Sequence, residues 1–288
     1  MQKSPRNARG FRRYEHYVTV NVSAAVFADN IRDLRARVAP AKLCVVMKAD
    51  AYGHGLERLA PVAAGADSIG ICIVGVMTHL ANADGEDLED ARRQLEEFWR
   101  LRREVAESLP PDVITRTHNS AATIRLPALR ADLVRVGAAC YGVRTSRAFE
   151  NPPELKPGMS MKTRVMEVRS VPAGRTIGYG SLFSTERASR IATIPVGFGE
   201  GYPRALFNKG IVLIRGRRCP VVGRVSLNIT TIDVTELDGD IEPGEEVTLV
   251  GAQGAESITF EELADKFSSV HTEINVMAGH MNERSYER

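Results

Sequence analysis

The sequence has few of the features that mark several classes of protein. Its 288 residues include four cysteines, which are far apart and form no CxxC pair, so neither a zinc site nor a dense disulfide framework is predicted. The 38 basic and 36 acidic residues nearly cancel to a net charge of +2, which gives no global field to attract nucleic acid or an anionic membrane. We therefore expect a cytoplasmic protein in a reducing compartment, with a small-molecule ligand.

Long apolar runs and targeting signals are also missing. The longest run, Ile69 to Leu80, is interrupted by glycines and polar residues and is too short to span a bilayer. Five of the first thirteen residues are Lys or Arg, but no apolar stretch follows them, which argues against a signal peptide. We expect residues 1–16 to form a frayed basic tail. The remaining composition, 43% hydrophobic and 26% charged, is typical of a globular protein without repeats.

The first half of the chain alternates predicted strands and helices. Apolar residues three to five positions apart predict an amphipathic helix from Ala24 to Val38. A second helix is expected at 88–105, and strands are expected at 43–47, 68–79, 113–117 and 133–141. Alternation of this kind is typical of a parallel βα barrel, in which ligands bind at the carboxyl ends of the strands.

The pattern changes after the Pro- and Gly-containing stretch at 151–158. Short β-rich runs predict a mostly antiparallel domain, with strands at 162–171, 190–197, 211–214, 221–225, 229–234 and 246–250. One helix is predicted after Thr259, because Glu262 stands three residues later and completes a capping box. The predicted organisation is a tail at 1–16, a barrel-like domain at 17–150 and a β-rich domain at 151–288.

The sharpest candidate for chemistry is the segment from Val45 to Gly55. Lys48 directly follows an apolar strand, where partial desolvation favours the neutral amine that imine formation requires. Tyr52, Gly53 and Gly55 allow a phosphate-bearing ligand to approach the backbone closely. A lysine at a strand end is more often simply solvated, so on physical grounds alone a structural role for Lys48 remains open.

Residues 48–55, Lys-Ala-Asp-Ala-Tyr-Gly-His-Gly, resemble the cofactor-lysine signature of the alanine racemase family. Further segments resemble that family in the same order: 78–84, 119–122, 134–137 with 141–142, 178–180, 195–197 with 201–204, and 222–226. The similarity runs from about Tyr17 to the C-terminus. It implies a fold-type III pyridoxal 5′-phosphate enzyme that interconverts L- and D-alanine, the latter a peptidoglycan precursor.

The resemblance implies two catalytic residues. Lys48 would hold the cofactor as an imine and serve as one acid/base, and Tyr179 would be the opposing acid/base. Removing a proton on one face and returning one on the other inverts the stereocentre. The family works as a homodimer in which the counterpart of Tyr179 reaches the neighbouring subunit's site.

Other roles are implied at matching positions. Arg135 would face the pyridine nitrogen, while the phosphate would be bound by Tyr52, Ser120 and Gly137. The substrate access path would be lined by His79, Asp84, Arg204 and Leu227. From the residues alone, His79 could equally be a buried polar side chain, Asp84 a helix start and Arg135 a structural ion-pair partner. No metal ligand is predicted.

The barrel half departs from the family by its length. A complete barrel needs about 200 residues or more, whereas Leu43 to Arg144 offers room for only four or five strands. About three βα units are missing between segments 68–72 and 74–79, including the arginine that meets the substrate carboxylate. Other departures are Arg116 at a histidine position, Thr272 at a tyrosine position and Leu227-Asn228 at a Met-Asp position.

The expected fold is therefore an α/β half, an incomplete or distorted barrel with two unpaired sheet edges, followed by a β-rich half. Two functions remain open. The first is an alanine racemase. The second is a descendant of that family that binds pyridoxal phosphate, or merely dimerises, without turnover.

Overall fold

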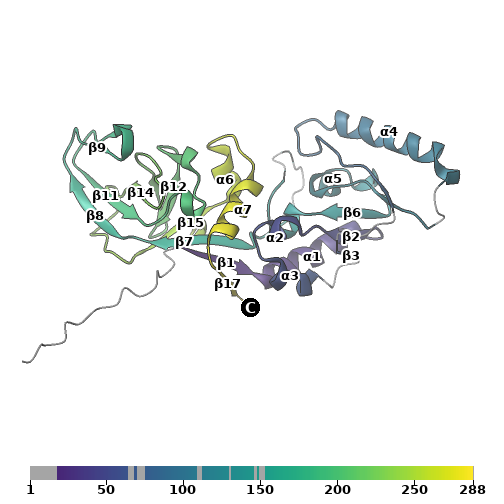
Figure 1. Ribbon diagram of the computed structural model, residues 1–288, viewed down its shortest axis with the longest axis horizontal. Helices are drawn as coiled ribbons and strands as arrows, with labels where there is room; N and C mark the ends of the chain where they lie inside the picture. Colours follow the sequence, from purple (N-terminus) through teal and green to yellow (C-terminus); the bar gives the residue numbers. More distant parts are fainter. Residues whose placement is uncertain are drawn as a thin grey trace, which may run out of the picture.

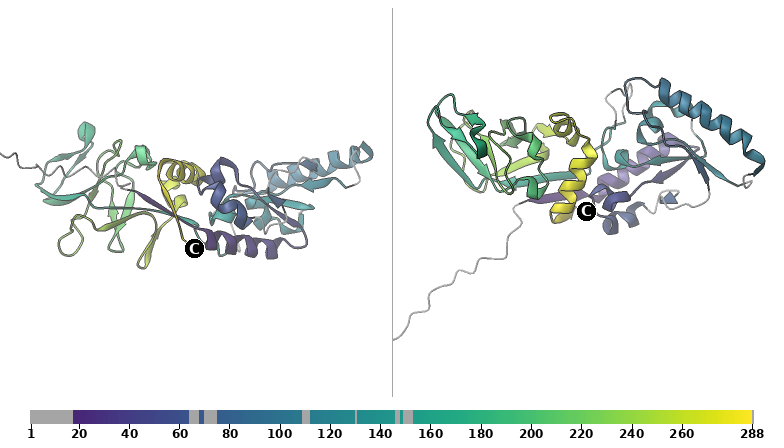
Figure 2. Two further views of the ribbon diagram at one scale, coloured as in Figure 1. Left: turned by 60° about the horizontal axis from the view of Figure 1, so that its bottom comes forward. Right: turned by 45° about the horizontal axis from the view of Figure 1, so that its top comes forward.

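The chain is organised in two halves that lie end to end (Figures 1 and 2). A computed structural model describes residues 18–63, 68–69, 75–108, 112–129, 131–145, 148 and 153–287. Within these ranges no helix has the length and apolar character needed to cross a membrane. The predicted basic tail lies outside the described residues.

The first half contains a parallel sheet of five described strands in the order β3-β2-β6-β5-β4. The strands are β2 (Lys42–Val45), β3 (Ser68–Ile69), β4 (Gly75–Met77), β5 (Ile114–Arg116) and β6 (Leu133–Val136). Because β3 and β4 stand at opposite ends of this order, the described strands form an open sheet. The expected incomplete barrel is confirmed.

Helices flank this sheet, and the first has the predicted bounds. The helices are α1 (Ala24–Val38), α2 (Lys48–Tyr52), α3 (Leu56–Ala63), α4 (Glu89–Glu104) and α5 (Ser120–Arg125), with 3-10 turns η1 (Ala106–Ser108), η2 (Pro127–Leu129) and η3 (Ala138–Tyr141). The side chain of Ser23 caps α1 by accepting a hydrogen bond from the N–H of Val26 at 3.2 Å. Apolar residues at the predicted spacing then face the core.

Two strand predictions in this half were too long. The run at 68–79 forms two short strands, β3 and β4, with residues 70–74 outside the described ranges. The run at 133–141 ends at Val136, because Gly137 leads the chain into the 3-10 turn η3. That turn brings the chain out at the carboxyl edge of the sheet, where ligands are expected.

The second half is mostly antiparallel, as predicted. Its strands are β1 (Thr19–Ser23), β7 (Met159–Arg164), β8 (Glu167–Val171), β9 (Thr176–Ile177), β10 (Phe183–Ser184), β11 (Ser189–Ile194), β12 (Ile211–Ile214), β13 (Arg217–Pro220), β14 (Thr230–Asp233), β15 (Glu246–Gln253), β16 (Glu256–Ile258) and β17 (Arg284–Glu287). Its helices are α6 (Phe260–Asp265) and α7 (His271–Met281), with 3-10 turns η4 (Tyr179–Ser181), η5 (Phe198–Glu200) and η6 (Arg204–Leu206). Thr259 accepts from the N–H of Glu262 at 3.1 Å, which confirms the predicted helix start.

Several features of this half differ from the prediction. The helix α7 was not predicted, and residues 221–225 form only an isolated bridge at Val221, while the unpredicted strand β13 precedes them. The run at 162–171 divides into β7 and β8, which belong to different sheets. Burial against the other sheets, which a local pattern does not reveal, decides each of these cases.

The strand β1 joins the two halves. It pairs antiparallel with β7 and parallel with β17, so it lies in the sheet order β13-β12-β15-β7-β1-β17, although it comes from the part of the sequence assigned to the barrel. It then leads directly into α1. One hydrophobic core contains residues of both halves, including Val20, Val45 and Leu213. A smaller cluster that includes Leu80, Leu95 and Leu126 lies beneath α4.

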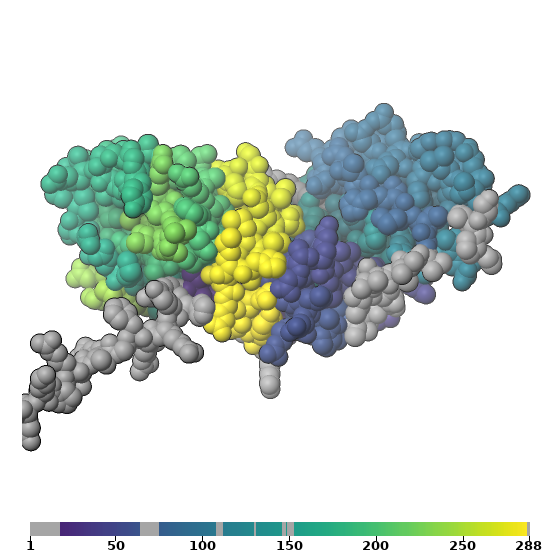
Figure 3. Space-filling model, in the orientation of Figure 1, coloured from purple at the N-terminus to yellow at the C-terminus, as the bar shows by residue number. Residues whose placement is uncertain are grey.

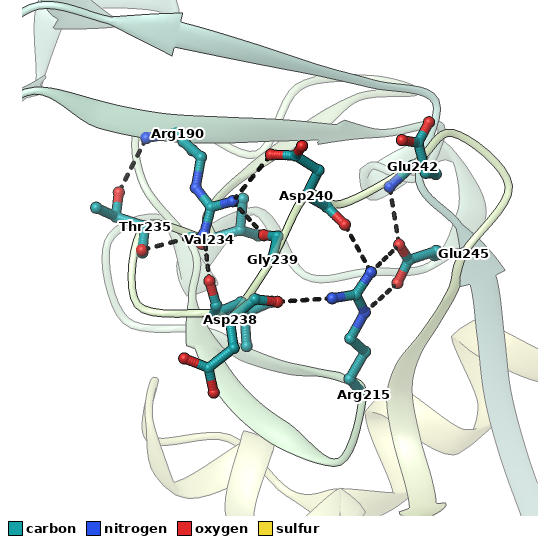
Figure 4. Close-up of polar contacts among 10 residues, drawn as sticks. Arg190, Arg215, Val234, Thr235, Asp238, Gly239, Asp240, Glu242 and Glu245 are labelled. Atoms are coloured by element: carbon teal, nitrogen blue, oxygen red, sulfur yellow. Dashed lines mark hydrogen bonds and ion pairs between the residues drawn. The ribbon is translucent and has the colours of Figure 1, made fainter.

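Two arginines organise the loop that follows β14 (Figure 4). The guanidinium of Arg190 donates to the carbonyl oxygens of Val234, Leu237 and Gly239. Arg215 donates to the carbonyl oxygens of Asp238 and Asp240, each at 2.7 Å. The carbonyls of a loop that has no regular structure are therefore satisfied by fixed cations.

Candidate active site

A cleft of about 1030 Å³ opens at the carboxyl ends of the parallel strands. Seven of the predicted site residues line it: Lys48, Tyr52, His79, Asp84, Ser120, Arg135 and Gly137. They come from four separate segments of the first half. The structure therefore brings these seven residues together in one cleft, and the remaining question is what chemistry their arrangement allows.

Lys48 stands at the start of α2, three residues after the end of β2. Lys48 is exposed, and not partly buried as the apolar strand before it suggested. The pKa of His79 is lowered by burial, then by the positive charges of Arg135 and Lys48. Lys48, His79 and Arg135 therefore line the same cleft and are close enough for their charges to interact.

The residues after Lys48 form one turn of left-handed helix. Ala49, Asp50, Ala51 and Tyr52 have φ between 52° and 56°. For a residue other than glycine, this left-handed conformation costs about 1–2 kcal/mol relative to the right-handed form. A run of four persists only because surrounding contacts hold it. This turn aims Tyr52 back into the cleft, towards Gly137.

Hydroxyl and N–H groups lie close together around Gly137 in the cleft. The N–H of Gly137 donates to the Oγ of Ser120 at 3.1 Å. A Cβ at position 137 would lie 2.5 Å from the Oη of Tyr52, so only glycine leaves room for that hydroxyl. Burial raises the pKa of Tyr52, with the nearby Cys140 acting in the same direction. Tyr52 is therefore a neutral hydrogen-bond donor at neutral pH.

Arg135 projects from β6 into the cleft and is held by the loop after β4. Its Nη2 donates to the carbonyl oxygen of Thr78 at 2.8 Å and lies 3.4 Å from the Nδ1 of His79. Its Nη1 is buried and has no hydrogen-bond partner among the described residues. Burial lowers the pKa of Arg135, and the charge of Arg116 adds to that effect, yet a guanidinium stays protonated.

The sequence analysis missed one wall of the cleft. The segment 270–273 at the start of α7 lines it, together with Val276 and Met277. Burial lowers the pKa of His271, and the negative charges of Glu261 and Asp84 oppose that change. Thr272 and Arg116, noted as departures, both line the cleft. No local signal predicted α7, whose N-cap Val270 makes no side-chain cap hydrogen bond.

Three predicted residues lie elsewhere. Tyr179 on η4 is 75% exposed, Leu227 is 56% exposed, and Arg204 on η6 is also exposed. All three belong to the second half, and none is among the described residues that line the cleft. Within one chain the structure therefore does not bring Tyr179 and Lys48 together.

The residues of the cleft fit pyridoxal 5′-phosphate by their chemistry. Hydroxyls of Tyr52 and Ser120 beside a backbone N–H suit a phosphate, and a lysine amine suits an aldehyde. The buried Nη1 of Arg135 offers one unused donor for a ring nitrogen. The side chain missing at Gly137 leaves the space that this donor set needs.

A parallel βα half with a lysine after a strand, joined to a β-rich half, resembles the fold of a known class of enzymes. The sequence profile of the alanine racemase C-terminal domain matches residues 158–286, and that of the N-terminal domain matches 22–74 and 69–145. The chain is 41% identical over 205 residues to the alanine racemase of Halothermothrix orenii, which is 71% of this chain and 54% of the relative. The chain belongs to the alanine racemase family.

Other comparisons agree. The alanine racemase of Syntrophobacter fumaroxidans is 40% identical over 216 residues, 75% of this chain and 57% of that protein. Among solved structures, alanine racemase from Bartonella henselae with covalently bound pyridoxal phosphate has a TM-score of 0.83 at 23% identity, covering 94% of this chain and 99% of that one. The Bacillus anthracis enzyme with bound L-Ala-P has a TM-score of 0.86 at 22% identity, covering 96% of each. These two likenesses show the fold.

The chain spans about half the length of the curated relatives that it matches, 54% and 57%. The fold alignments nevertheless extend nearly from end to end of the solved structures. The N-terminal profile matches in two stretches that overlap at residues 69–74, which agrees with an interruption inside the barrel half.

Proposed function

We propose that this chain binds pyridoxal 5′-phosphate at Lys48 and interconverts the enantiomers of alanine. The observation that carries the proposal is the single cleft shared by Lys48, Tyr52, Ser120, Arg135 and Gly137. Membership of the alanine racemase family supports the same function. Because the chain covers only about half of its relatives, the activity, the substrate and the partner are inferences to be tested.

Five residues of the cleft have a role in this proposal. The bound cofactor supplies an aldehyde for Lys48 and an electron-withdrawing ring that acidifies the substrate Cα–H. Lys48 moves a proton on one face of the substrate. Tyr52, Ser120 and the backbone at Gly137 hold the phosphate. Arg135 donates to the ring nitrogen without giving up its proton, which limits side reactions that need a protonated ring.

The second acid/base is proposed to come from a second copy of the chain. Tyr179 is 75% exposed in its own subunit, and Leu182 and Leu227 nearby in the second half are also exposed. The side chain of Asn208 links this region by donating to the carbonyl oxygen of Leu182 and accepting from the N–H of Gly223. A two-fold dimer would deliver one Tyr179 to each of its two clefts.

The substrate path follows from the same arrangement. His79 and Asp84 lie in the cleft of one subunit, while Arg204 and Leu227 would reach it from the other. A cytoplasmic location is part of the proposal. It is supported by the three described cysteines, Cys44, Cys140 and Cys219, which are buried free thiols.

Two measurements test the proposal. Protein loaded with pyridoxal phosphate is expected to exchange the Cα proton of L-alanine in D₂O and to form D-alanine. Lys48→Ala should abolish both the exchange and the absorbance band of the bound cofactor. If the wild-type protein shows no exchange under cofactor saturation, the racemase assignment is wrong.

A second function, cofactor binding without turnover, is favoured by one observation. The described parallel strands form an open sheet with β3 and β4 at its edges, and the sequence shows no counterpart of the arginine that the family resemblance implies at the substrate carboxylate. Loss of such a clamp costs about 2–5 kcal/mol, which is thirty- to several-thousand-fold in rate. A cofactor band that depends on Lys48, without exchange, would select this function.

A further inference from the structure

The left-handed turn after Lys48 is braced from the far end of the chain. Asp50, within the turn, forms an ion pair with Arg284 of β17, although 234 residues separate them in sequence. The same Nη1 of Arg284 donates to the carbonyl oxygen of Gly53 at 3.2 Å. The space-filling view shows the C-terminal residues, in yellow, lying directly against the segment that contains α2 and α3 (Figure 3).

Asp50 also organises the backbone that follows the turn. Its Oδ1 accepts from the N–H of Leu56 at 2.7 Å, while its Oδ2 meets Arg284. Burial alone would raise the pKa of Asp50, but the hydrogen bonds from Leu56 and Arg284 outweigh it and lower the pKa. The carboxylate is therefore charged at neutral pH, and it fixes both ends of the segment 50–56.

Other groups close the remaining sides of the turn. The Nδ1 of His54 lies 3.1 Å from the carbonyl oxygen of Ala51 and 3.0 Å from that of Tyr52. The hydroxyl of Tyr286, also on β17, donates to the carbonyl oxygen of His54 at 3.2 Å. A short left-handed turn has no following helix whose N–H groups could donate to its last carbonyl oxygens. The side chains of His54 and Tyr286 supply hydrogen-bond partners for these carbonyls instead.

The strand that carries Arg284 is itself rigidly placed. β17 pairs in parallel with β1, with Val20 opposite Arg284, and Val20 is fully buried. A side chain on a paired strand holds its position better than one on a free tail. The strain of four left-handed residues needs an anchor of this kind, because the turn is too short to be stable alone.

We propose that Arg284 is a positioning residue for the cofactor lysine: from the C-terminal strand it holds the left-handed turn that sets Lys48 and Tyr52 at the cleft. Arg284 touches neither substrate nor cofactor and acts only through Asp50 and Gly53. The inference rests on the proposed binding of pyridoxal phosphate at Lys48. Its consequence is that the β-rich half, through its last strand, controls the geometry of the cofactor site in the barrel half.

Hydrogen exchange in the cofactor-free protein tests the contact directly. The reporters are the amides of Gly53, Gly55 and Leu56, which donate to Ala49 O, Asp50 O and Asp50 Oδ1. Arg284→Gln is expected to speed exchange at these amides at least tenfold. The amide of Val46, which donates to Val136 O within the sheet, should exchange as in wild type.

The matched control is Arg58→Gln. Arg58 is exposed and stacks over the same Tyr286 ring, 5.8 Å from its centroid, and none of the described hydrogen bonds joins it to the turn. It should leave the three reporter amides unchanged within twofold. Equal effects of the two variants would overturn the proposal, because they would show that general packing around Tyr286 matters and the Asp50 contact does not.

Cofactor affinity supplies the second readout. The dissociation constant of pyridoxal phosphate, from a fluorescence titration, is expected to rise about tenfold in Arg284→Gln and to stay within twofold in Arg58→Gln. Arg284→Lys keeps the positive charge but loses the planar guanidinium with its several N–H donors, so its effect should be smaller than that of Arg284→Gln. Should Arg284→Gln fail to fold, Asp50→Asn removes the same ion pair while keeping an acceptor for Leu56, and it decides by the same readouts.

The outcomes separate the two proposals. If wild-type protein does not bind pyridoxal phosphate, the proposed function fails, while the exchange data still decide whether Arg284 holds the turn. If wild type binds but Arg284→Gln leaves both exchange and affinity within twofold, the positioning role is refuted and the proposed function stands.

Discussion

At the scale of single residues, the motif 48–55 contains side chains whose surroundings change their chemistry. His54 is buried, and its ring packs 4.5 Å from that of Tyr141. Burial lowers the pKa of His54 to about 4, although hydrogen bonds to the carbonyls of Tyr52 and Ala51 oppose the change. The imidazole is therefore neutral in the folded protein and acts as a fixed donor within the turn.

The charge state of His54 predicts acid sensitivity. An unfolded histidine titrates near 6.5, so lowering the pH from 6.5 towards 4 protonates the unfolded chain first and costs folding stability. At pH 5 the cost is about 2 kcal/mol, and it is absent above about pH 7. Urea unfolding of wild type and His54→Gln across pH 4.5–7.5 measures it. Parallel pH dependence in the two proteins would contradict the prediction.

The close contact between Gly137 and Tyr52 leads to a prediction for cofactor binding. In Gly137→Ala the new Cβ would meet the Oη of Tyr52 at 2.5 Å, so the tyrosine must move away. The affinity for pyridoxal phosphate is expected to fall about tenfold, equivalent to about 1.4 kcal/mol. Gly158→Ala is the control, because its Cβ would make an ordinary contact at 3.5 Å. Similar cofactor affinity in both variants would argue against a phosphate site here.

At the scale of elements, hydrogen bonds from two arginines, Arg190 and Arg215, stabilise a loop that has no regular structure. Arg190 lies on β11, where it faces the loop carbonyls of Val234, Leu237 and Gly239 (Figure 4). Because each charge-assisted hydrogen bond satisfies a backbone group, removing the guanidinium leaves several carbonyls without a protein partner.

Arg190→Ala is therefore expected to lower the free energy of unfolding by about 1.5–3 kcal/mol. Arg169→Ala on the adjacent strand β8 provides the control, since Arg169 forms an exposed ion pair with Glu167 and should change stability by less than about 1 kcal/mol. Chemical denaturation monitored by circular dichroism compares them. A smaller loss for Arg190 than for Arg169 would contradict this account of the loop.

At the scale of the whole molecule, the proposed site is completed only by a second copy. Lys48 lies in the cleft of the first half, whereas Tyr179 is exposed on the second half of the same chain. If each site takes its lysine and its tyrosine from different subunits, two different inactive variants can restore one intact site per mixed dimer.

Mixing Lys48→Ala with Tyr179→Phe tests this arrangement. After equal mixing and subunit exchange, half of the dimers are mixed and each has one intact site, so about a quarter of wild-type activity is expected. Each variant alone should be inactive. Dimers that mix, as shown by native mass spectrometry, but recover no activity would contradict a shared site.

Much of the candidate cofactor site could be predicted from the sequence because its information is local. The motif 48–55 and the helix at Ala24 to Val38 depend on neighbouring residues, and both lie where the pattern indicated. Lys48, Ser120, Arg135 and Gly137 each follow a parallel strand or belong to one, and the ends of parallel strands meet at one edge of a sheet.

The rest was decided by contacts between distant parts of the chain. The helix α7, the place of β1 in the second sheet and the ion pair of Asp50 with Arg284 all join segments far apart in sequence. Their residues carry no local pattern, because burial and partners exist only after the chain has folded. The amino-acid sequence determined which groups could hold the cofactor. The tertiary structure alone decided that the last strand of the chain contacts the turn that follows Lys48.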